Sequence, residues 1–134
     1  MRATLAAAAY LFAALAFLFA ARDAFACGHC VEDRVAAVYD HGIIVRALER
    51  KHQVAFLAIE GTIPQAGELR RSIESGLGAV KGIDRGTARV SLESASFSFA
   101  YDPRQPGLGP ILRALESRLS KRSLNLSILR VIDD

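Results

Sequence analysis

Apolar positions recur along the chain with two different periods, and these periods predict its helices and strands. Where apolar residues alternate with polar ones, or form a short run before a turn, a strand is predicted. Where they recur at spacings of three and four, they form one stripe along a helix. The pattern predicts strands over residues 54–59, 88–92, 97–101 and 124–128, and helices over residues 67–80 and 110–119.

The predicted order, strand–helix–strand–strand–helix–strand, is that of the ferredoxin-like βαββαβ fold, an α+β architecture with a four-stranded antiparallel sheet. Both helices bury their stripe on one face of the sheet, so the other face must be solvated or covered. Residues 30–41 have helical character, with Val31, Val35 and Val38 on one side. This extra helix is a candidate cover, and residues 43–51 fit either more helix or an extended segment.

The first 26 residues have the pattern of an export signal. A positive start and a long apolar run precede Ala24-Phe25-Ala26, which supplies small residues at the −3 and −1 positions of a signal-peptidase site. An uncleaved membrane anchor is the alternative, because the run is long enough to span a bilayer. Either way we expect a periplasmic or secreted protein in an oxidising compartment. The predicted organisation is a signal peptide at 1–26, a cysteine motif and helix at 27–52, and the ferredoxin-like domain at 53–134.

Composition and charge narrow the classes of partner. The 134 residues include 17 Lys and Arg against 14 Asp and Glu, and the basic residues are scattered rather than grouped in a stripe. The chain has no Trp that could stack on bases. Nucleic acid is therefore not an expected partner. Two cysteines allow one bridge or one two-thiolate site, not a disulfide framework.

The residues that carry chemistry are Cys27-Gly28-His29-Cys30. Two thiols three positions apart can point at one atom, and a place at a helix start favours the thiolate form. Thiolates bind soft metals, and two of them can hold Cu(I) nearly linearly. Zinc would need four ligands, so it would also require His29, His41, the amine of Cys27 or a second chain in a homodimer. The predicted metal ligands are Cys27, Cys30 and His29.

The same four residues allow two other interpretations. Cys-Gly-His-Cys is also the active-site tetrapeptide of protein disulfide isomerases, so thiol–disulfide exchange is the alternative activity. We rank it second, because the thioredoxin fold needs a strand before the motif and export processing would leave nothing before Cys27. A plain bridge between Cys27 and Cys30 is the third interpretation. We therefore expect a binding protein rather than an enzyme.

Residues 54–116 resemble the heavy-metal-associated domain family. The resemblance rests on Glu60-Gly61 after the first strand, on the helix and turn from Ile73 to Ile83, and on Tyr101-Asp102-Pro103 at the end of the third strand. It implies a ferredoxin-like fold and binding of a metal ion such as copper. It also implies a partner such as a membrane metal transporter or a periplasmic acceptor protein.

The metal-binding loop of that family is not present in this sequence. The family's two loop cysteines correspond to Ala66 and Leu69, and neither side chain can ligate a metal. The domain therefore resembles a metal carrier without its own metal loop, which leaves the cysteine motif at residues 27–30 as the candidate site. A non-catalytic interaction domain is the alternative to a metal carrier.

Overall fold

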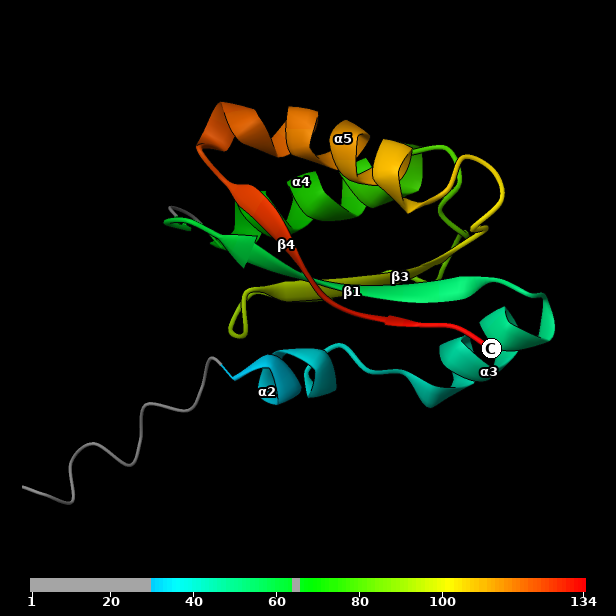
Figure 1. Ribbon diagram of the computed structural model, residues 1–134. Helices are drawn as coiled ribbons and strands as arrows, with labels where there is room; N and C mark the ends of the chain where they lie inside the picture. The colour runs from blue at the N-terminus through cyan, green and yellow to red at the C-terminus, as the bar shows by residue number, and fades with distance from the viewer. Residues whose placement is uncertain (1–29, 64–65) are drawn as a thin grey trace, which may run out of the picture.

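The computed structural model describes residues 30–63 and 66–134 (Figure 1). The predicted signal peptide lies outside this part of the chain. None of the described helices is both long and apolar enough to cross a membrane. The elements are α2 (Val31–Ala36), α3 (His41–Glu49), β1 (Gln53–Glu60), α4 (Ala66–Ala79), β2 (Arg89–Ser91), β3 (Ser96–Tyr101), α5 (Leu108–Leu119), a 3-10 turn (Ser120–Arg122) and β4 (Asn125–Ile132).

The four strands form one antiparallel sheet in the order β2-β3-β1-β4. The two central strands are thus β1 and β3, and the last strand lies beside the first. This order, with α4 and α5 as the crossovers, confirms the predicted ferredoxin-like fold. The structure also confirms the predicted hairpin between β2 and β3, in which Val90 pairs with Phe97.

One face of the sheet is covered by α4 and α5, which form the upper layer in Figure 1. Leu69, Ile73 and Leu77 recur at helical spacing along α4 and are buried, as the predicted stripe requires. They pack in one cluster with the inward residues of the strands. The turn after α4 needs a glycine, since Gly82 has a φ of 102° and a Cβ there would lie 2.2 Å from Cδ of Pro106.

The opposite face is covered by α2 and α3, and here the predicted single helix over residues 30–41 is wrong. The first helix ends at Ala36, and α3 begins at His41. Asp40 separates them with an extended backbone, and its Oδ1 accepts a hydrogen bond from the Ile43 amide at 3.1 Å. This capping bond competes with a continuous helix and starts a new one.

The two short helices close a second core, so the predicted cover is confirmed in a different form. Its centre is Phe56, which points away from α4 and has no exposed surface. Every residue of β3 is buried as a result. The polar residues of that strand are therefore not solvated. Ser96 and Ser98 donate hydrogen bonds to the carbonyls of Arg34 and Val38, at 2.9 and 2.8 Å.

Candidate metal centre

Cys30 is the one predicted metal ligand within the part of the chain that the structure describes, since Cys27 and His29 lie outside it. It precedes α2 as the N-cap residue, with extended backbone angles, and its side chain is exposed. Its carbonyl accepts a hydrogen bond from the Arg34 amide at 3.1 Å, which closes the first turn of the helix. The thiol of Cys30 is thus accessible at the start of a short helix.

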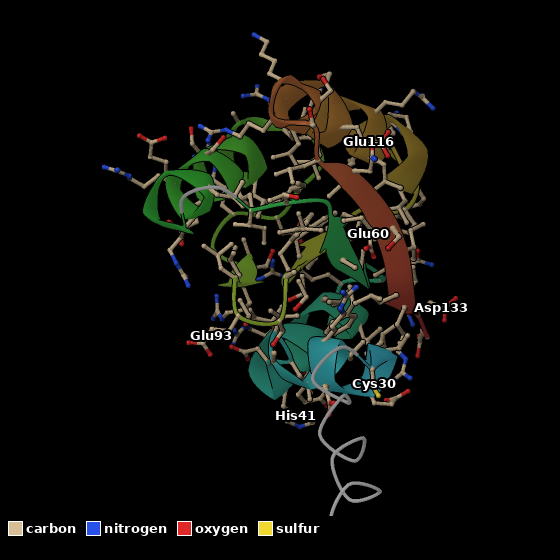
Figure 2. All side chains as sticks on the ribbon, turned by 90° about the vertical axis from the view of Figure 1, so that its left-hand side faces the viewer. Cys30, His41, Glu60, Glu93, Glu116 and Asp133 are labelled. Carbon is tan, nitrogen blue, oxygen red and sulfur yellow. The ribbon has the colours of Figure 1, made fainter. Side chains whose placement is uncertain are left out.

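Ion pairs fix this helix on the sheet. Nη1 of Arg34 lies 3.1 Å from Oε1 of Glu60, and the hydroxyl of Ser127 donates to the same oxygen at 3.1 Å. Two residues earlier, Glu32 pairs with Arg130 of β4 at 2.5 Å. Because Glu60 ends β1, these contacts hold Cys30 at the same end of the sheet. Figure 2 views the molecule from that end and labels both residues.

Charges around the start of α2 are nearly balanced. Two carboxylates, Glu32 and Asp33, lie in its first turn, where the unpaired amides of a helix favour negative charge. Arg34 follows, and most of its side chain is buried. Its Nε is the one buried side-chain polar atom of the described residues without a hydrogen-bond partner. The carbonyl of Cys30 is thus bonded to the amide of Arg34, whose Nη1 is paired with Glu60.

The family's metal loop would lie at this same end of the sheet, between β1 and α4. Here its second cysteine position, Leu69, is fully buried in the core under α4. The other position, Ala66, begins the helix. The structure confirms that Leu69 has a packing role, so this part of the loop offers no metal ligand.

The histidines of the described residues do not join Cys30. His41 begins α3, and its Nδ1 lies 3.4 Å from the hydroxyl of Tyr39. Figure 1 shows α2 and α3 one after the other beneath the sheet, and Cys30 precedes α2 as its N-cap residue. Within residues 30–63 and 66–134, no three His, Cys, Asp or Glu side chains are placed to hold a metal ion.

Sequence analysis missed a polar cluster around His52. Its Nδ1 lies 2.7 Å from Oδ2 of Asp84, and its Nε2 lies 3.9 Å from Oδ2 of Asp102. The amide and guanidinium of Arg104 lower the pKa of Asp102, with a smaller effect from His52. The cluster joins the start of β1 to two loops, and the residues are too far apart in sequence for spacing to predict it.

No family model and no curated protein sequence matches the chain. Similar solved structures include a copper-binding domain from HMA7, a P-type ATPase, with 19% identity and a TM-score of 0.48 over 59% of this chain and 96% of that one. A second is the N-terminal domain of a potential copper-translocating P-type ATPase from Bacillus subtilis in its Cu(I)-loaded state, with 18% identity and a TM-score of 0.48 over 62% and 94% of the two chains. A third is oxidised MerP from Ralstonia metallidurans CH34, with 14% identity and a TM-score of 0.44 over 59% and 99%.

Proposed function

We propose that this is an exported protein that binds Cu(I), or another thiophilic metal, through Cys27, Cys30 and His29. The observation that carries the proposal is the place of Cys30, whose exposed side chain precedes a helix that ion pairs hold on the sheet. The other two ligands lie one and three positions before it in the sequence.

The chemistry of the ligands favours a soft metal. Thiolate ligands select Cu(I) over hard cations such as magnesium, and two thiolates satisfy Cu(I) without further ligands. Zinc is the other metal that this set could hold, with His29 as the third ligand and a fourth from the amine of Cys27 or from a second chain. The exposed side chain of Cys30 also suits a protein that hands its metal on, because an acceptor must reach the thiolate.

The proposed partner is therefore a metal acceptor, either a membrane metal transporter or a periplasmic protein. Periplasmic or secreted localisation is part of the proposal and rests on the predicted export signal. In this view the ferredoxin-like domain is a scaffold and does no catalysis.

The test is a competition titration of the reduced protein with Cu(I) and a chelator of known affinity. We expect one Cu(I) per chain, and loss of that binding in the double variant Cys27→Ser, Cys30→Ser. Val31→Ser is a matched control, because Val31 is 47% exposed beside the motif and has no thiol. Unchanged Cu(I) affinity in the double variant would overturn the proposal.

Thiol–disulfide exchange is the second candidate, and the accessible Cys30 at the end of the Cys-Gly-His-Cys sequence favours it. It predicts a reduction potential well above that of structural disulfides, which lie below about −300 mV. It also predicts reduction of insulin by the wild-type protein and none by Cys30→Ser. If neither Cu(I) binding nor insulin reduction is observed, the chain is an interaction domain.

A further inference from the structure

A pocket of about 100 Å³ lies between α3 and the loop before β2. Its walls carry three arginines, namely Arg46 from α3, Arg50 as the C-cap residue of that helix and Arg85 from the loop. Ala47 and Ala100 lie among them and give the pocket a buried apolar floor. This site is on the opposite side of the second core from the end that holds Cys30, and it does not depend on the metal proposal.

None of the three arginines has a carboxylate within ion-pair distance among residues 30–63 and 66–134. Asp40, which caps α3, and Asp84, which lines the pocket, already have other partners. Oδ2 of Asp40 binds Arg89 at 2.9 Å, and its Oδ1 accepts from the Ile43 amide. Asp84 also lines the pocket, but its Oδ2 lies 2.7 Å from Nδ1 of His52. The three guanidinium groups therefore leave an excess of positive charge around one small space.

Two of the arginines form a pair that is unfavourable without a counter-ion. Arg46 lies in the last turn of α3 and Arg50, four positions later, is its C-cap residue, and like charges at this spacing repel. An anion in the pocket would remove that repulsion. The planar guanidinium fork also matches a phosphate oxygen pair better than a lysine would.

The third arginine is presented by a fixed turn. The amide and hydroxyl of Thr87 both donate to the carbonyl of Asp84, at 3.3 and 2.7 Å, and the Thr87 hydroxyl accepts from the Ala100 amide on β3. Gly86 has a φ of 76°, which the turn requires. Because the turn is bonded to the sheet, the backbone of Arg85 is held across from α3 before any ligand binds.

We propose that Arg46, Arg50 and Arg85 form a binding site for a phosphate group. A tetrahedral anion with about two negative charges can accept hydrogen bonds from all three guanidinium groups and balance most of their charge. Free phosphate and the phosphate of an anionic lipid headgroup offer this same chemistry.

The test is a titration of the full chain with inorganic phosphate, followed by amide chemical shifts and by calorimetry, with chloride at equal ionic strength as reference. We expect shifts at Gly86, Thr87 and Ala100. The double variant Arg46→Gln, Arg50→Gln should bind phosphate at least about tenfold more weakly. The loss of one charge-assisted hydrogen bond alone lowers affinity by about that factor. The matched control is Arg71→Gln, Arg113→Gln, which removes two exposed arginines from α4 and α5 and should bind as the wild type does.

A second arm separates the two sources of phosphate. Vesicles of phosphatidylglycerol are compared with vesicles of phosphatidylcholine, for the wild type and for both double variants. Arginine-dependent binding of inorganic phosphate supports a free ligand, and arginine-dependent binding of phosphatidylglycerol vesicles alone supports a lipid headgroup. The proposal is overturned if neither binding depends on Arg46 and Arg50. In that case the arginines only complement the C-terminal end of α3, and their removal lowers the free energy of unfolding alone.

Discussion

The two faces of the sheet are built in different ways. The face under α4 and α5 is closed by fourteen buried residues, nearly all of them apolar, at regular helical and strand spacing. The face under α2 and α3 has eight such residues and adds buried hydrogen bonds and ion pairs. The regular face contains the pattern of a known fold. The other face carries both Cys30 and the arginine pocket, so both proposed sites lie on the side of the sheet that α2 and α3 cover.

The first prediction is that the buried residues on both faces of the sheet stabilise the folded state. Phe97 and Phe56 have no exposed surface and point to opposite sides of the sheet. Replacing either by Ala should lower the free energy of unfolding by about 3–5 kcal/mol, from lost burial and a cavity. Urea denaturation measures the change. The control is Val45→Ala on the outer side of α3, where Val45 is 39% exposed and a change within about 0.5 kcal/mol is expected. If Phe56→Ala is as stable as this control, α2 and α3 do not pack as described.

The second prediction concerns the buried hydrogen bond of Ser98 on the α2 and α3 face. Ser98→Ala removes the hydroxyl that donates to the carbonyl of Val38 and leaves that carbonyl without this donor. The expected loss is about 1–3 kcal/mol in the free energy of unfolding. Ser117→Ala is the control, because its hydroxyl makes a similar bond to Ala114 on the exposed side of α5. Equal losses in the two variants would mean that burial of the Ser98 bond has no energetic effect.

The smallest effect is expected from the charge of Asp40. The amide of Ile43, and then Arg89, lower the pKa of this carboxyl below its ordinary value. Its charged form therefore stabilises the folded state above the ordinary pKa of aspartate, and this contribution is lost as the pH falls through the lowered pKa. Asp40→Asn keeps a capping side chain but removes the charge. It should be slightly less stable than the wild type at pH 7, and the difference should shrink towards pH 2. A difference that is constant with pH would contradict the role of the charge.

Most of the regular face could be predicted from the sequence, and the reasons are physical. The stripe of Leu69, Ile73 and Leu77 is explained by a helix that packs on a core. The order of this helix among the predicted strands then selects the ferredoxin-like topology. The break between α2 and α3 was harder to predict, because the cap at Asp40 outweighs a periodicity that continues through it. Ser98 alternates with apolar residues, as a solvated position does. It is buried because α2 and α3 cover that face of the sheet.

The two candidate sites also differ in how far the sequence predicts them. Cys30 could be found from its neighbours in sequence, since the motif is contiguous. The arginine pocket could not, because Arg85 reaches it from a loop 35 residues after Arg50, and no spacing rule links them.

The most direct test of the central claim is the X-ray absorption spectrum of copper bound to the reduced protein. The chain has only three sulfur atoms, in Met1, Cys27 and Cys30, and the predicted signal-peptide cleavage removes the first. We expect a copper shell of sulfur atoms in the wild type and none in Cys27→Ser, Cys30→Ser. A shell of nitrogen and oxygen alone in the wild-type protein, or a sulfur shell that persists in the double variant, would contradict it.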